Sequence, residues 1–315
     1  EVTISTRLGD EFTLDFDFAL DGAYDTYGWW GDPSTGTGGT FLWPDACAEV
    51  YPCSPDLTGQ PISYTINVAG VPEGYQVIYP NSVDGATLYQ PAIVVGDYAL
   101  DDVGTSLLGT PVSWWRLPND DANGYAQVRS RVVAYLDWYE FYLGAYPWGP
   151  KLSPVSVRWC SPGQSCAYGG MEDHPNPEIS ADNLAYVDGD PSDGIGSSAE
   201  YYTGSTVVAH EVAHAWAHGG LTVKPECVAD FLAVNEGGMT YLSTVARAAV
   251  DGVYSEQDYR DFFSRSLAKY IAYDVLAWNP LFCADPFSNY SSMTYYRGAL
   301  LWYWIQDQVG QDALL

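Results

Sequence analysis

Basic residues are scarce in this chain of 315 residues. Twelve lysines and arginines stand against 40 aspartates and glutamates, only three residues are lysine, and the formal net charge is -28. Because phosphate groups would repel such a surface, this balance excludes nucleic acid and anionic membranes as partners. The sequence also lacks any apolar run approaching the roughly 18 to 20 residues of a membrane-spanning helix, so we expect no membrane insertion.

Cysteine spacing of the zinc-knuckle type is missing as well, because none of the six cysteines belongs to a CxxC motif. An even number of cysteines with close pairs favours three disulfides formed in an oxidising compartment. We therefore predict a secreted or otherwise extracytoplasmic protein, the alternative being buried free thiols in a cytosolic one. The pairs suggested by spacing are Cys47 with Cys53, Cys160 with Cys166, and Cys227 with Cys283.

Hydrophobic residues make up 47% of the chain, enough for two domains with their own cores. Apolar and polar residues alternate over 12–20 and again over 62–68, which predicts strands buried on one face. The polar segment 119–124 (NDDANG) is typical of a linker. We therefore expect an α+β protein, with a β-rich N-terminal domain at 1–120 and a second domain at 121–315.

The second domain is expected to be mainly helical. Apolar residues fall at helical spacing over 128–143, and the alternation over 155–159 predicts a strand. Ser255 and Asp258 have the spacing of a capping box, which predicts the start of a helix. Tyr295 falls in an aromatic-rich segment that we expect to be helical as far as Gln308.

The strongest chemical signal is the HExxH motif formed by His210, Glu211 and His214. On a helix, residues four apart lie about 40° apart around the axis, so both imidazoles project from one face and can share an ion. A catalytic zinc ion takes a third protein ligand and leaves one position open for water. Glu236, in the sequence Asn235-Glu236-Gly237, is the candidate ligand, and zinc the candidate metal.

Several alternatives stay open at this stage. Glu226 and Asp230 are rival third ligands. His218 continues the same helix face, and a supporting or surface histidine is a simpler interpretation than a fourth ligand. The two motif histidines could also be ordinary core or surface residues. Calcium is a further candidate cofactor in the acidic segment 188–194, although its spacing fits no EF-hand and a solvated turn is the simpler interpretation. The acidic residues of this segment are Asp188, Asp190 and Asp193.

Four motifs in a fixed order resemble the zinc aminopeptidase family that includes aminopeptidase N, among the gluzincin metallopeptidases. That family has Gly-Ala/Gly-Met-Glu-Asn, then HExxH, then Asn-Glu-Gly, then Tyr-x-Lys-Gly. Segments 43–53 and 93–98 also resemble its N-terminal β domain, so the similarity covers most of the chain. The motifs here are Gly169-Gly170-Met171-Glu172-Asp173, His210 to His214, Asn235-Glu236-Gly237, and Tyr295-Tyr296-Arg297-Gly298.

The resemblance implies a fold, a reaction and a set of roles. The second domain would be a thermolysin-like catalytic domain, with the family's helical C-terminal domain absent or outside this sequence. His210, His214 and Glu236 would bind one Zn2+, and Glu211 would be general base through a zinc-activated water. Tyr295 would stabilise the oxyanion. Glu172 would bind the free amino terminus of a peptide substrate, with Gly169, Gly170 and Met171 of the same motif also in the substrate-binding site.

The chain also departs from the family pattern. Twenty-one residues separate His214 from Glu236, where the family has 18, and Asp173 and Arg297 replace its Asn and Lys. Trp43 stands where the family has an acidic or amide residue beside the substrate amine. The expected function is therefore an aminopeptidase, with two alternatives: a gluzincin endopeptidase of altered specificity, or a non-catalytic zinc-stabilised binding module. No particular oligomeric state is predicted.

Overall fold

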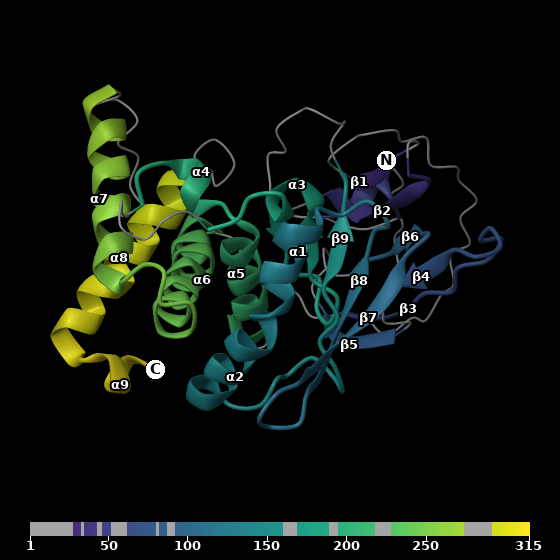
Figure 1. Ribbon diagram of the computed structural model, residues 1–315, viewed down its shortest axis with the longest axis horizontal. Helices are drawn as coiled ribbons and strands as arrows, with labels where there is room; N and C mark the ends of the chain where they lie inside the picture. Colours follow the sequence, from purple (N-terminus) through teal and green to yellow (C-terminus); the bar gives the residue numbers. More distant parts are fainter. Residues whose placement is uncertain are drawn as a thin grey trace, which may run out of the picture.

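The protein combines helices and strands, which confirms the predicted α+β class. The computed structural model describes residues 28–32, 35–42, 46–51, 62–79, 82–86, 92–159, 169–188, 195–217, 228–273 and 292–315. In Figure 1 the helices gather on one side of a central sheet, and the strands of the N-terminal part lie on the other side.

The central sheet has five strands in the order β10-β11-β9-β8-β7. The inner pairs β11 with β9 and β9 with β8 are parallel, whereas the outer pairs β10 with β11 and β7 with β8 are antiparallel. Parallel neighbours require crossovers. Helices α1 (Ala122–Arg129) and α2 (Val132–Leu143) lie between β8 and β9, whereas the segment between β9 and β11 contains strand β10. The strands are β7 (Ala99–Thr105), β8 (Pro111–Arg116), β9 (Val155–Val157), β10 (Gly170–Met171) and β11 (Glu178–Ser180).

Two smaller antiparallel sheets precede it. One has the order β1-β2-β6-β4, and the other pairs β3 with β5. The strand expected over 62–68 is confirmed as far as Thr65, while the one expected over 12–20 lies outside the described residues. The elements are β1 (Gly28–Asp32), β2 (Thr37–Phe41), the 3-10 turn η1 (Ala46–Glu49), β3 (Ile62–Thr65), β4 (Gln76–Ile78), β5 (Ser82–Ala86) and β6 (Val94–Gly96).

The central sheet is continuous across residue 120, where the sequence predicts a domain boundary. Strands β7 and β8 precede that residue but pair into the same sheet as β9, β10 and β11. The expected linker also has a structural role. Helix α1 begins at Ala122, inside the segment, because the Asp121 carboxylate caps it by accepting hydrogen bonds from the Asn123 and Gly124 amides at 3.1 and 2.7 Å.

Two helices lie between strands β8 and β9 in the chain, and the other helices follow β11. The helix expected over 128–143 is broken at Ser130 and Arg131 into two, whereas the capping box is confirmed by reciprocal hydrogen bonds between Ser255 and Asp258. The helices are α1 (Ala122–Arg129), α2 (Val132–Leu143), α3 (Ala181–Leu184), α4 (Ser198–Tyr201), α5 (Gly204–Ala217), α6 (Val228–Val250), α7 (Glu256–Tyr273), α8 (Ser292–Val309) and α9 (Gln311–Leu314).

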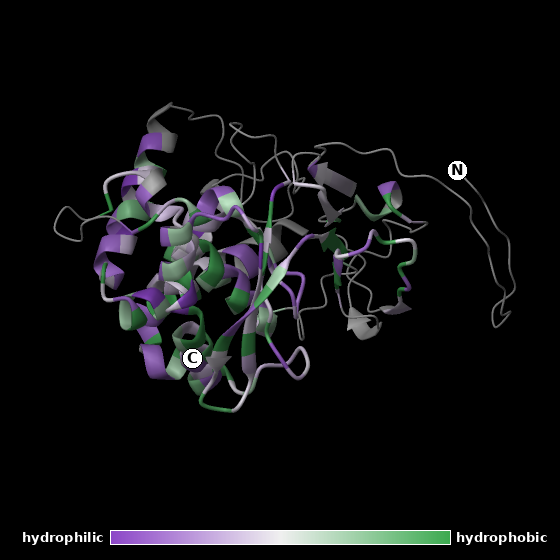
Figure 2. Ribbon diagram, turned by 45° about the vertical axis from the view of Figure 1, so that its right-hand side comes forward, coloured by the Kyte–Doolittle hydropathy of each residue, from purple (hydrophilic) through white to green (hydrophobic). Residues whose placement is uncertain are grey.

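The central sheet separates two hydrophobic cores. On one face Trp114 and Ile179 pack with the helices, and on the other Val155, Val157 and Trp159 pack with the N-terminal strands. Figure 2 shows the corresponding pattern, with hydrophobic colouring toward the interior of the helical layer and hydrophilic colouring on outer helix surfaces. Alternate side chains of the central strands therefore pack into the two different cores, because successive residues of a β-strand point to opposite faces of the sheet.

Two further expectations can be compared with the described part of the chain. No helix there is long and apolar enough to cross a membrane. Cys47 is disulfide-bonded, and the other five cysteines lie outside the described residues.

Candidate metal centre

Helix α5 carries the HExxH motif through the protein interior. Of its 14 residues, 12 are buried, and only His210 and Trp216 keep some exposure. A helix that is apolar on nearly all sides is stable only when other elements surround it. The motif is therefore held by tertiary packing rather than on a surface helix.

Helix α6 lies beside α5 and brings Glu236 to the two histidines. The Glu236 Oε2 atom is 3.1 Å from His210 Nε2 and 3.5 Å from His214 Nε2, and the two Nε2 atoms are 3.0 Å apart. The three ligand atoms lie within 4.8 Å of one another and can hold a metal ion. The structure thus brings together the three residues that the sequence nominated.

The tautomer of His214 suits this role. Its Nδ1 atom is 3.2 Å from Asn235 Oδ1. Because an amide oxygen only accepts, Nδ1 carries a proton, and in the neutral imidazole the Nε2 lone pair then faces the cluster. Metal-binding histidines commonly have such a hydrogen bond on the second ring nitrogen, which orients the ring. Asn235, the residue before Glu236, therefore orients one histidine of the candidate centre.

The charges of the three groups are strongly coupled. For Glu236, burial alone would raise the pKa, but hydrogen bonds from His210 and His214 outweigh it and lower the pKa. For His214, burial is outweighed by Glu172, Glu236 and Glu211, which raise the pKa to about 9. Since a metal binds the neutral imidazole, metal and proton compete for this nitrogen.

Glu211 and Glu172 face each other beside this cluster. Their carboxylates and His214 Nε2 lie within 4.8 Å of one another, and all three residues are buried. Burial, reinforced by Glu172 and Glu236 and opposed by His214, raises the pKa of Glu211 well above its ordinary value. Gly170 makes room for this arrangement, because a Cβ at that position would lie 2.5 Å from the Glu211 carboxylate.

Tyr295 enters the site from helix α8. Its ring centroid is 5.8 Å from that of His210. The approach depends on two glycines, since a Cβ on Gly237 of α6 would lie only 2.4 Å from the Gly298 Cα of α8. Two backbones can come this close only where neither carries a side chain. The glycines of the third and fourth motifs therefore position Tyr295.

Three side chains from other elements hold α5 by its carbonyl oxygens. The donors are Tyr139 Oη to Ala209 at 2.7 Å, His174 Nε2 to Glu211 at 2.9 Å, and Trp148 Nε1 to Ala215 at 2.8 Å. The three accepting carbonyl groups therefore lie just before, within and just after the HExxH motif. Neutral donors of this kind each contribute about 1 kcal/mol, and here they also fix the rotation of the helix.

His174 was missed by the sequence reasoning, although it follows Glu172-Asp173 directly. It is buried, donates from Nε2 to the carbonyl of the general-base candidate Glu211, and therefore accepts from the Tyr146 hydroxyl at Nδ1, 2.8 Å away. The Trp148 ring stacks on it at a centroid distance of 6.3 Å. The one sequence feature that could have indicated a role for His174 is its position directly after the Gly169–Asp173 motif.

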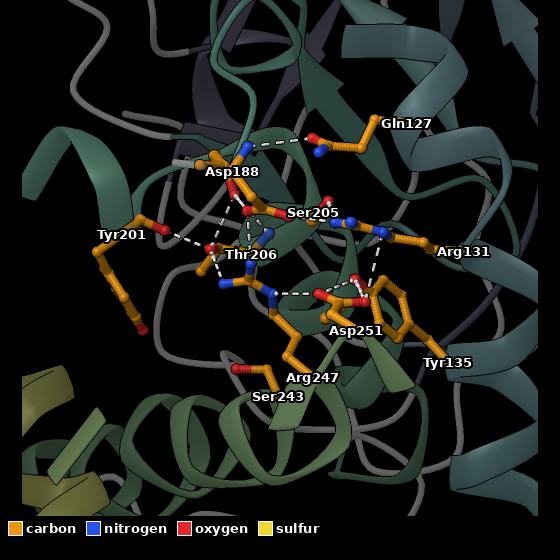
Figure 3. A network of polar contacts seen from close by, with 12 residues as sticks. Gln127, Arg131, Tyr135, Asp188, Tyr201, Ser205, Thr206, Ser243, Arg247 and Asp251 are labelled. Carbon is orange, nitrogen blue, oxygen red and sulfur yellow. Dashed lines mark hydrogen bonds and ion pairs between the residues drawn. The ribbon is translucent and has the colours of Figure 1, made fainter. Parts of the chain in front are cut away.

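A buried network of charges fixes the other end of α5 (Figure 3). Arg247 of α6 contacts Asp188 at 2.6 Å, Asp251 at 3.1 Å and the Thr206 hydroxyl of α5 at 2.5 Å. Arg131, at the start of α2, contacts the same two carboxylates. Asp188 is thus neutralised by two arginines, which contradicts a solvated turn at this residue and removes it as a calcium ligand; 189–194 lie outside the described residues.

We expect Arg247→Met to lower the free energy of unfolding by about 3 to 5 kcal/mol, because it leaves the Asp188 and Asp251 carboxylates buried beside a single partly exposed arginine. Denaturant unfolding measures this loss. Arg260→Met is the matched control, since its partner Asp307 is 52% exposed and such surface pairs contribute about 1 kcal/mol or less. Equal losses in both variants would contradict the structural importance of the network.

The remaining nominated residues are distributed as follows. Gly169 lies against Val207 of α5, whereas Met171 points to the opposite face of the sheet, into the core with the N-terminal strands. Arg297 is half-buried, and burial lowers its pKa. The side chains of Trp43, His218, Glu226 and Asp230 lie outside the described residues.

No model of a known protein family matches this sequence, and no curated protein matches it significantly.

Proposed function

We propose that the protein is a zinc-dependent metallopeptidase, and specifically an aminopeptidase that removes the N-terminal residue of peptides. One observation carries the proposal. Two imidazole nitrogens and one carboxylate oxygen converge within 4.8 Å, and two further buried carboxylates, Glu172 and Glu211, lie within 4.8 Å of one of the same histidines. A structural site would need the first group but not the second.

The donor set supports zinc among the metals. Two histidine nitrogens and a single carboxylate make three protein ligands, the number typical of catalytic zinc, whereas calcium and magnesium prefer oxygen. When bound, zinc would polarise the scissile carbonyl and lower the pKa of a water molecule. The donors fit the ion, and Asn235 supplies the supporting hydrogen bond.

Glu211 is the residue that we assign to proton transfer. A carboxylate with an ordinary pKa is a weak base, and a raised pKa brings it closer to the optimum for taking and returning protons near neutral pH. Glu211 would accept the proton of the attacking water and donate it to the departing amine. Its fixed position next to His210 on α5 keeps it within the site throughout.

Tyr295 would stabilise the negative charge that develops on the carbonyl oxygen of the substrate. Its ring approaches His210 from α8, on a different element from Glu211. A phenol that donates a hydrogen bond to the tetrahedral oxyanion stabilises the transition state more than the ground state. Substrate would thus lie between Glu211 and Tyr295.

Strand β10 offers the binding surface for an extended peptide. It is the edge strand of the central sheet, and Gly170 on it lies against Glu211. An extended peptide can add to such an edge by backbone hydrogen bonds. Glu172, at the end of the strand, would then pair with the terminal ammonium, which limits cleavage to the first residue.

Hydrolysis of aminoacyl reporters and their acetylated counterparts tests this assignment. We expect cleavage of free-amine substrates only. Glu172→Gln should lower kcat/KM for them by about one to two orders of magnitude, since it removes one charged hydrogen-bond partner from the ammonium. Glu73→Gln, the same change on an exposed residue, is the control and should leave kcat/KM unaltered.

Other outcomes favour the alternatives. Cleavage of acetylated or internal bonds, with Glu172→Gln without effect, would contradict the aminopeptidase assignment and support a gluzincin endopeptidase. Absence of hydrolysis in a metal-loaded protein would support a non-catalytic binding module.

A further inference from the structure

Two acidic residues lie on the face of the central sheet that looks away from the metal centre. In the antiparallel pair of β10 and β11, Glu178 stands opposite Met171, whereas Gly170 and Ile179 face the helices. Because side chains alternate along a strand, Glu178 and Met171 share the far face. Asp173 follows two residues after Met171, in the turn closed by the Asn176 amide bonding to the Asp173 carbonyl at 2.8 Å.

Both carboxyl groups are buried, and three of their four oxygens have no hydrogen-bond partner. Glu178 is 0% and Asp173 3% exposed. Neither oxygen of Glu178 has a partner, and Oδ1 of Asp173 has none either. The hydroxyl of Ser180, two residues beyond Glu178 on the same face of β11, is also buried and unpartnered. Four polar oxygens therefore lie unsatisfied on this face of the sheet.

The charges around the pair are negative. Burial first, and then Glu178, Glu172 and Glu211, raise the pKa of Asp173 well above its ordinary value, and burial raises that of Glu178. No lysine or arginine is among these influences. The two acids also act on nearby tyrosines. Asp173 raises the pKa of Tyr51 and Tyr64, and Glu178 raises that of Tyr98. Arg158 is the cation that lowers the pKa of Tyr98, and its guanidinium contacts Asp182 and the Asn119 carbonyl.

Two adjacent buried carboxylates cannot both stay ionised without a counter-charge. One shared proton would make one O–H···O bond, which engages two oxygens and leaves the third carboxylate oxygen unpartnered. A single cation, in contrast, can be bound by both carboxylates and supplies the counter-charge. All the donors are oxygen atoms, whereas zinc prefers nitrogen and sulfur ligands. Calcium takes oxygen ligands in a flexible geometry, while magnesium demands a near-ideal octahedron, so calcium is the cation that we expect here.

We propose that Asp173 and Glu178 form a second cation site, specific for calcium, on the face of the sheet opposite the His210, His214 and Glu236 cluster. Backbone carbonyl oxygens and water would complete the oxygen ligands. The ion would join the turn after β10 to strand β11 and so fix the segment that carries Glu172 and His174. The site stands on its own residues and does not depend on the proposed peptidase activity.

Calcium binding to the full chain, kept saturated with zinc, is the test. After dialysis into calcium-free buffer, titration calorimetry should find one tight calcium per chain, and added calcium should raise the Tm. In Glu178→Gln the affinity should fall by about a hundredfold or be lost, because one of the two charged ligands is removed. Zinc content should be unchanged, and Glu73→Gln should bind calcium as the wild type does.

A second measurement needs no variant. Terbium, which replaces calcium at oxygen sites, should show luminescence sensitised by the nearby tyrosines, and calcium should quench it by competition. The proposal is overturned if the wild type binds no calcium tightly, or if Glu178→Gln and wild type respond alike. A Tm that rises on acidification but not with calcium would mean that the pair shares a proton, and this too would overturn it.

Discussion

Glu211→Gln should lower kcat for free-amine peptide substrates by about three orders of magnitude or more while leaving the bound metal in place. The amide has the shape of the carboxylate but cannot accept a proton, and general acid and base catalysis contributes about 10² to 10⁴. Here one residue serves both steps. Steady-state kinetics and metal analysis of the same preparation measure the two effects together.

The geometry indicates that Glu211→Gln changes proton transfer without disturbing the metal cluster. Glu211 does not belong to the cluster of His210, His214 and Glu236, so its replacement removes none of the three proposed metal ligands. The His174 hydrogen bond goes to the Glu211 backbone carbonyl and survives the change. Glu73→Gln, on an exposed turn, should keep full activity. Wild-type turnover in Glu211→Gln would show that the proton passes through another group.

Glu236→Gln should weaken zinc binding by more than about a hundredfold, since even residues that only support a ligand contribute 10- to 100-fold. A hundredfold loss corresponds to about 2.7 kcal/mol of metal-linked stability. The readout is the difference between unfolding with and without zinc, because the loss of the Glu236 contacts to the histidines affects both conditions. Hydrolysis should disappear at low zinc and return in part at high zinc.

Two results bear against this expectation. If Glu236→Gln binds zinc with wild-type affinity, the third ligand is another acid, and Glu226 and Asp230 are the rivals. If its stability falls equally with and without zinc, the carboxylate acts only as a partner of the histidines. Glu73→Gln again serves as the isosteric control.

The parts of the site that sequence predicted are those set by local geometry. His210 and His214 meet because four residues make about one helical turn, and Ser255 caps α7 because three residues bring it back to Asp258. Glu236 was predicted from the need for a third protein ligand and from the match of its Asn-Glu-Gly motif, and the structure places it 3.1 Å from His210. Such contacts depend on short spacing or on a known pattern.

The parts that sequence could not predict depend on distant partners. Asp188 looked like a residue of a solvated acidic turn, but Arg131 and Arg247 neutralise it from 57 and 59 residues away. His174 reaches the Glu211 carbonyl across 37 residues. Local composition holds no information about such pairs, because tertiary packing alone brings them together.

The continuity of the sheet across residue 120 has a similar cause. The segment 119–124 has a polar composition that suits a linker and a helix cap equally well, and Asp121 is the cap of α1. Nor does the alternation within β8 show its partner, since the hydrogen bonds of Trp115 to the β9 side come from a segment 40 residues further on. Strand pairing at that separation is a property of the whole fold.

Stoichiometric zinc reconstitution tests the central claim most directly. The wild-type protein is stripped with a chelator, zinc is added back in fractions of one ion per chain, and hydrolysis of a free-amine aminoacyl reporter is followed at each addition. We predict that activity rises linearly and stops at one zinc per chain. Tight binding of one zinc without hydrolysis of any free or blocked substrate, or hydrolysis that survives complete removal of metal, would contradict the account.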